Sequence, residues 1–160
     1  MRQMLSRSTN RHSDKSMDQK LKREHYKVFY PITTRWDDND IYGHINNVRF
    51  YSFFDSAVNR FLIEEGGLDI HNANVVGYVV ESKCQYHSPL AYPEAIEVGI
   101  TIGKLGNRSV TYEVAVFKQG EQIAAANGHF VHVFVDRQSS QSVPMPASIS
   151  EAFESLQSSV

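Results

Sequence analysis

A short polar segment in the first third of the chain holds most of the side chains that could do chemistry. It runs Asp37-Asp38-Asn39-Asp40-Ile41-Tyr42-Gly43-His44-Ile45-Asn46-Asn47 and is too polar and irregular for a strand. Because Asp40 and His44 stand just before a segment of helical periodicity, free backbone N–H groups and the positive end of the helix dipole should lie beside them. Hydrolysis at a carbonyl carbon needs an attacking oxygen and donors that stabilise the oxyanion formed on the carbonyl. A carboxylate beside a helix N-terminus can supply both.

The segment that follows has the periodicity of an amphipathic helix, from Val48 to about Glu65. Its apolar residues fall at i, i+3, i+4 and i+7 and so share one face; they are Phe50, Phe53, Phe54, Ala57, Val58, Phe61 and Leu62. Asn46 or Asn47 is a suitable N-cap, and Gly66-Gly67 is a suitable helix end. We expect this face to be covered by a sheet or another helix.

The other ordered segments are predicted strands. A period-two pattern begins near His25 and continues to Thr34, and Pro31 within it indicates an edge strand or a bulge. Apolar residues alternate or run together at 75–87, 95–104, 108–118 and 122–135, and the short turns between them favour antiparallel hairpins. A short amphipathic helix is predicted at 148–157. One strand, one long helix and four strands in a meander predict an α+β fold with the helix packed on an antiparallel sheet.

Composition narrows the class of protein. With 160 residues, 41% of them hydrophobic and 11% aromatic, the chain has the size and composition of one globular domain. We expect residues 1–22 to form a disordered tail and 23–160 a single domain, with Met1 and Met17 both open as the start of the protein. A net charge of −2 gives no support to nucleic-acid binding, and no apolar stretch is long enough to span a membrane. The single cysteine, Cys84, excludes an intrachain disulfide, and together these features predict a cytoplasmic protein.

Residues 38–47 resemble the D-x-D-x-x-G-H-x-N-N signature of hotdog-fold thioesterases. These are the proteins related to 4-hydroxybenzoyl-CoA thioesterase and to plant acyl-ACP thioesterases. Two later segments agree with the family pattern, Tyr86-His87-Ser88-Pro89-Leu90 and Phe134-Val135-Asp136 followed by Pro144-Met145-Pro146. The resemblance covers about residues 26–147 and implies a hotdog fold that hydrolyses acyl-CoA to the free acid and CoA.

The resemblance also implies roles for individual residues. Asp40 matches the catalytic carboxylate, which acts either as nucleophile or as general base, and backbone N–H groups near Asn46 and Asn47 would form the oxyanion hole. His44 matches a histidine that some plant-type members use as a catalytic partner, and it is equally suited to a structural hydrogen bond. Those members have Asn two residues before that histidine, where this chain has Tyr42, and the difference favours a single-carboxylate mechanism. No cofactor is implied, since CoA is part of the substrate.

Cations and histidines elsewhere in the chain are further candidates for ligand contacts. CoA carries phosphates, so cations should lie near the mouth of its site, and Lys104 and Arg108 are the first candidates. Each of these two side chains is equally compatible with being a solvated surface charge that binds no ligand. His129 and His132 are not predicted to bind a metal, because residues three apart on a strand face opposite sides.

Other functions and assemblies stay open at this level. A homodimer or homotetramer is expected, because a lone helix on a sheet leaves apolar surface exposed and the active sites of the resembling family form between subunits. A non-catalytic acyl-CoA-binding protein and an acyl-ACP thioesterase are the alternatives to an acyl-CoA thioesterase. A hotdog dehydratase is disfavoured, because the chain lacks the H-F-x-x-x-P pattern such enzymes use. The sequence does not select the acyl group.

Overall fold

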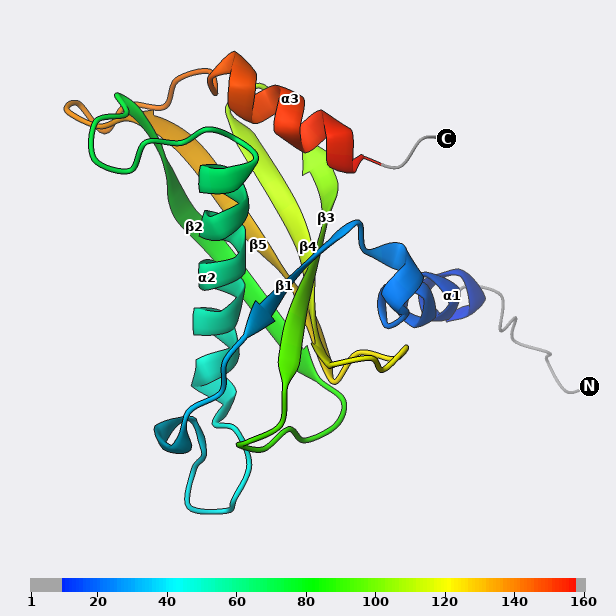
Figure 1. Ribbon diagram of the computed structural model, residues 1–160. Coiled ribbons are helices and arrows are strands. Elements are labelled where there is room, and N and C mark those ends of the chain that lie inside the picture. The colour runs from blue at the N-terminus through cyan, green and yellow to red at the C-terminus, as the bar shows by residue number, and fades with distance from the viewer. Residues whose placement is uncertain (1–9, 158–160) are drawn as a thin grey trace, which may run out of the picture.

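The long helix predicted from the phenylalanine periodicity is α2, Asn47–Glu64, and it lies across one face of a five-stranded antiparallel sheet (Figure 1). The computed structural model describes residues 10–157. The strands are β1 (Val28–Ile32), β2 (Val75–Tyr86), β3 (Ile96–Leu105), β4 (Ser109–Lys118) and β5 (Ala126–Asp136). A shorter helix, α3 (Ala147–Leu156), covers one end of the sheet. This arrangement confirms the predicted α+β hotdog fold.

The order of the strands differs from the predicted meander. β3, β4 and β5 pair consecutively, but the full order is β1-β3-β4-β5-β2, so β2 and β1 form the two edges. Residues 87–95 therefore cross the end of the sheet from one side to the other instead of closing a hairpin. The segment is longer than the roughly two to five residues of a usual hairpin loop, and its turn-forming residues suit a crossover equally well. The predicted edge position of the strand that contains Pro31 is confirmed.

The buried face of α2 follows the predicted pattern. All of its predicted apolar residues are buried, and they pack against the inward side chains of the strands, among them Val98, Tyr112 and Val114. The side chain of Asn46 caps the helix by accepting the N–H of Val48 at 3.1 Å. At the other end, Gly67 has a φ of +68°, a left-handed conformation that favours glycine and terminates the helix. The sequence thus placed both ends of the helix to within one residue.

Part of the segment expected to be a disordered tail, residues 10–22, lies within the described chain. Asn10–Lys20 form α1, and Arg23–His25 form the single-turn helix η1, on the face of the sheet opposite α2 (Figure 1). Lys20 Nζ lies 3.1 Å from a carboxylate oxygen of Glu113, and His25 Nε2 lies 2.5 Å from the other. Glu113 is far away in sequence, so local composition could not reveal these contacts. Residues 1–9 lie outside the described part of the chain.

None of the helices within residues 10–157 is long and apolar enough to cross a membrane.

Candidate active site

Asp40 lies in a tight loop between the single-turn helix η2 (Trp36–Asp38) and α2. Its N–H donates to the carbonyl of His44 at 2.8 Å, and its own carbonyl accepts the N–H of Gly43 at 3.1 Å. Oδ1 of its carboxylate accepts the N–H of Tyr42 at 2.8 Å. Gly43 has a φ of +85°, so the turn needs a residue that adopts the left-handed region without strain. Backbone hydrogen bonds therefore hold the Asp40 carboxylate in place.

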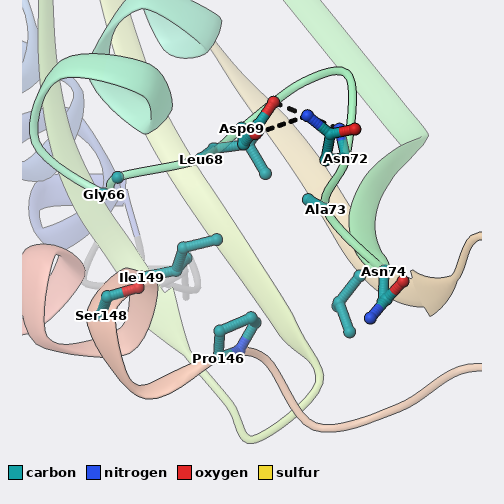
Figure 2. A pocket seen from close by; sticks show the side chains of 11 residues that line it. Gly66, Leu68, Asp69, Asn72, Ala73, Asn74, Pro146, Ser148 and Ile149 are labelled. Carbon is teal, nitrogen blue, oxygen red and sulfur yellow. Dashed lines mark hydrogen bonds between the residues drawn. The ribbon is translucent and has the colours of Figure 1, made fainter.

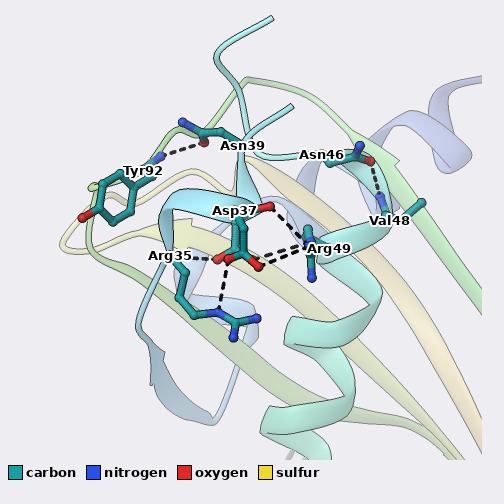
Figure 3. A network of polar contacts seen from close by, with 8 residues as sticks. Arg35, Asp37, Asn39, Asn46, Val48, Arg49 and Tyr92 are labelled. Carbon is teal, nitrogen blue, oxygen red and sulfur yellow. Dashed lines mark hydrogen bonds and ion pairs between the residues drawn. The ribbon is translucent and has the colours of Figure 1, made fainter. Parts of the chain in front are cut away.

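Polar contacts join residues 36–38 to the start of α2 (Figure 3). Asp38 is only 2% exposed, and its carboxylate accepts the N–H of Arg35 at 2.7 Å. Its carbonyl accepts the N–H of Asn46 at 2.9 Å. From α2, the Arg49 guanidinium lies 3.7 Å from carboxylate oxygens of both Asp37 and Asp38. These contacts fix the position of the loop relative to the helix N-terminus.

The crossover after β2 supports the other side of the loop. The carbonyl of Leu90 accepts the N–H of Ile45 at 2.7 Å, and the N–H of Tyr92 donates to Oδ1 of Asn39 at 3.0 Å. The rings of Trp36 and Tyr92 meet edge to face with their centroids 5.9 Å apart. The loop is thus held between α2 and a segment that lies more than forty residues later in the chain.

The first turn of α2 leaves a backbone donor available. Asn46 is the N-cap: its side chain accepts the N–H of Val48, and its carbonyl accepts the N–H of Arg49 at 2.9 Å. Within residues 10–157, no protein group accepts the N–H of Asn47, the first residue of the helix. A free N–H at the positive end of a helix is suited to bind an oxyanion.

A cavity of about 950 Å³ brings these groups together. Asp40, Asn46 and Asn47 all line it, so the structure places three of the predicted catalytic residues at one site. Trp36 and Tyr42 also line the cavity, and they are 75% and 82% exposed. Large aromatic side chains exposed beside a cavity are typical of a binding surface. The part that each residue plays in catalysis stays a prediction.

His44 has a different position. Its carbonyl accepts the N–H of Asp40, but its imidazole is exposed and, within the described residues, makes no hydrogen bond or ion pair. His44 is not among the residues that line the cavity. The structure therefore does not bring its ring to the Asp40 carboxylate, and its role as a catalytic partner stays a prediction.

Lys104 and Arg108 flank the turn between β3 and β4, at the end of the sheet remote from Asp40 (Figure 1). Arg108 donates to the carbonyl of Ser142 at 2.6 Å and lies 3.2 Å from its hydroxyl. Within one chain the structure does not bring these two cations to the cavity, and their contact with CoA stays a prediction. Sequence reasoning overlooked Arg35, which directly precedes η2 and has a side chain 66% exposed.

A second cavity, of about 360 Å³, lies at the C-terminal end of α2 between Gly66 and Pro146 (Figure 2). Asp69 supplies the carboxylate in the lining of this cavity. That carboxylate accepts hydrogen bonds from the side-chain N–H of Asn72 at 3.0 Å and from the backbone N–H of His71 at 3.0 Å. These hydrogen bonds, led by that of Asn72, hold the pKa of Asp69 below its ordinary value. The carboxylate is thus engaged in shaping its own loop.

Three other residues whose side chains could do chemistry are held in structural positions. His132 is 2% exposed, its Nδ1 lies 3.1 Å from the Tyr112 hydroxyl, and burial lowers its pKa to about 4. His129 faces the other side of the sheet, 3.5 Å from a carboxylate oxygen of Glu81. Burial raises the pKa of the Cys84 thiol to about 11, which disfavours the thiolate that a nucleophile requires.

Comparison with known proteins places the chain among relatives of the same fold. Residues 34–153 match the model of the thioesterase-like superfamily. The solved structure of the PA5185 protein from Pseudomonas aeruginosa strain PAO1 is 55% identical, with a TM-score of 0.85 over 86% of this chain and 96% of that one. The PA2801 protein of Pseudomonas aeruginosa is 30% identical, with a TM-score of 0.73 over 78% and 95% of the two chains. The gentisyl-coenzyme A thioesterase BH1999 is 26% identical, with a TM-score of 0.69 over 79% and 99%.

Proposed function

We propose that this chain, which belongs to the thioesterase-like superfamily, hydrolyses acyl-CoA thioesters at the cavity beside Asp40. The family supports thioester hydrolysis in general. The observation that carries the proposal is that Asp40, whose carboxylate is hydrogen-bonded, and Asn47, the first residue of α2 with an N–H that no protein group within residues 10–157 accepts, line the same cavity. The likeness to a gentisyl-coenzyme A thioesterase supports a CoA ester as the substrate class.

In the proposed reaction the thioester carbonyl binds between Asp40 and Asn47. Either the carboxylate attacks the carbonyl carbon and gives a mixed anhydride that water hydrolyses, or it takes a proton from the water that attacks. In both cases the carbonyl oxygen becomes negative and accepts the N–H of Asn47. The carbon–sulfur bond then breaks, and the CoA thiolate leaves and takes up a proton. One oxyanion donor of this kind contributes about 10²–10³-fold to turnover.

We also propose that the active unit is a homodimer formed through β2. This strand is an edge of the sheet, and Tyr78, Val79 and Val80 on it are 46%, 48% and 59% exposed. An exposed apolar edge strand is a template for pairing with another strand, and a second copy of β2 offers the same row of free N–H and C=O groups. The crossover that follows β2 contacts the Asp40 loop, so the interface would adjoin the site.

The first experiment is release of free thiol from a panel of acyl-CoAs, from acetyl-CoA to benzoyl-CoA. The wild type is compared with Asp40→Ala and with Asp55→Ala, a control that removes an exposed carboxylate from α2. We expect Asp40→Ala alone to lose turnover by orders of magnitude at an unchanged unfolding temperature. Full activity in Asp40→Ala would refute the assignment. No turnover of any acyl-CoA, with CoA esters still bound, would favour an acyl carrier protein ester as substrate or a non-catalytic binding role.

A further inference from the structure

We infer that Tyr86 is a positioning residue for thioester hydrolysis, acting through Asn47; the inference rests on the function proposed above. Tyr86 is the last residue of β2, and its hydroxyl donates to the carbonyl of Asn47 at 2.9 Å. Asn47 is among the residues that line the cavity beside Asp40, and no protein group within residues 10–157 accepts its N–H. One side chain from the edge strand thus fixes the peptide plane that follows the oxyanion donor.

The position of Tyr86 is itself well defined. Its ring packs edge to face on Phe50 of α2, with centroids 5.1 Å apart and planes at 90°. Burial raises the pKa of the Tyr86 phenol above its ordinary value, so the hydroxyl stays protonated and available as a donor. A carbonyl oxygen has two lone pairs, so that of Asn47 can accept this bond in addition to a helical one. The contact joins β2 to α2 across 39 residues of sequence.

The first turn of a helix is where such a contact has most effect. Helix ends fray, and their backbone groups are the least restrained in the element. An oxyanion donor must lie within hydrogen-bond distance of the position that the charged oxygen takes, and a displacement of about 1 Å can cost about 10²-fold in rate. Within the described residues no protein acceptor holds the N–H of Asn47 itself, and the carbonyl of the same peptide group, that of Asn46, accepts the N–H of Arg49. The hydrogen bond from Tyr86 therefore restrains the residue that carries the charge-stabilising group.

The effect should fall on kcat more than on KM. The oxygen of a bound thioester carries little charge, whereas the oxyanion is fully charged, so a well-placed N–H stabilises the transition state more than the substrate. We expect Tyr86→Phe to lower kcat about tenfold and to leave KM within about twofold. Phe keeps the ring contact with Phe50 and removes only the hydroxyl, so the fold should be preserved.

The experiment measures kcat and KM for wild type, Tyr86→Phe and Tyr26→Phe, with the acyl-CoA that the wild type turns over fastest. Tyr26→Phe is the matched control: it also removes a hydroxyl that donates to a backbone carbonyl, that of Lys20 at 2.6 Å, and Tyr26 lies in a buried cluster separate from the one that contains α2. The amide signal of Asn47 is followed in parallel by ¹⁵N NMR and hydrogen exchange. We expect faster exchange and a shifted signal at Asn47 in Tyr86→Phe, and wild-type behaviour in Tyr26→Phe.

The possible outcomes distinguish a failure of the role inferred for Tyr86 from a failure of the proposed function. An active wild type with an equally active Tyr86→Phe, or with an unchanged Asn47 amide, overturns the role of Tyr86 and leaves the proposed function intact. An equal loss of kcat in Tyr26→Phe also overturns it, because the loss would then follow from removing any such hydroxyl and not from the hydrogen bond to Asn47. A wild type that releases no thiol refutes the proposed function itself, and the role of Tyr86 in hydrolysis fails with it.

Discussion

The guanidinium of Arg49 lies 3.7 Å from the buried carboxylate of Asp38 and joins the first turn of α2 to the turn that precedes Asp40. A cation in the first turn of a helix opposes the macrodipole and costs about 0.3–1 kcal/mol when exposed. Arg49 offsets this cost by also donating to the carbonyl of Asp37 at 3.2 Å. A residue that breaks a local preference in favour of distant contacts is characteristic of a functional site.

We therefore predict that Arg49→Gln lowers turnover and stability together. Loss of the guanidinium leaves the Asp38 carboxylate buried without its cation, at a cost of about 1 kcal/mol, because the Arg49 side chain is itself 36% exposed. For a chain of this size that corresponds to a shift of about 2–4 °C in unfolding temperature. A double-mutant cycle with Asp38→Asn checks the pairing: the double variant should lose less stability than the two single variants summed. Strict additivity would contradict it.

How much of the candidate site the sequence could predict depends on how far apart its residues lie in the chain. Asp40, Asn46 and Asn47 lie within eight residues of one another, so loop composition and helix capping were enough to bring them to one site. The support from Tyr86 and Leu90 arises from residues some forty positions away, and no local periodicity encodes it.

The meander was mispredicted for a similar physical reason. The apolar pattern identified β2 correctly, but it could not show that this strand pairs with β5 instead of β3, because an alternating strand fits beside either neighbour. Lys104 and Arg108 are predicted from their charge near turns. The antiparallel register of β1 with β3 puts this turn at the end of the sheet remote from Asp40, and the contact of the two cations with CoA stays a prediction.

Gly128→Ala should be among the most destabilising single substitutions in the sheet. A Cβ at this position of β5 would lie 1.8 Å from the carbonyl oxygen of Lys83 on β2, which is backbone and can move only with its strand. We expect a loss of about 3 kcal/mol or more, or failure to fold. Gly106→Ala is the control, because its nearest neighbour at 3.2 Å is the rotatable hydroxyl of Ser109. Similar unfolding temperatures for the two variants would contradict the prediction.

His132 should make stability depend on pH in the acid range. Burial depresses its folded-state pKa to about 4 from an ordinary value of 6.5, so the unfolded chain binds the proton more readily. Its contribution is complete above pH 6.5 and is lost as pH falls to about 4, by about 3 kcal/mol in total. Urea unfolding between pH 7 and pH 4 measures this, and His132→Asn, which can still pair with the Tyr112 hydroxyl, should flatten the dependence. The same slope in both proteins would assign it to other groups.

A single-carboxylate mechanism predicts a modest effect of His44→Ala. The imidazole is exposed and does not line the cavity, so its removal should lower kcat by less than about tenfold, against orders of magnitude for Asp40→Ala. A loss of kcat in His44→Ala as large as that in Asp40→Ala would instead show that His44 acts as a catalytic partner.

Val80→Lys should dissociate the proposed dimer. Val80 is 59% exposed at the irregular point of the edge strand β2, between Val79 and Glu81, and a charge there would oppose pairing with a second β2. Ile123→Lys is the matched control, since Ile123 is 57% exposed but lies in the connection between β4 and β5. Sedimentation velocity should report a dimer for the wild type and Ile123→Lys and a monomer for Val80→Lys.

Thiol release should fall with dissociation, because the crossover that follows β2 supports the Asp40 loop. A Val80→Lys protein that sediments as a dimer would place the interface elsewhere, and an active monomer would show that the site is complete in one chain.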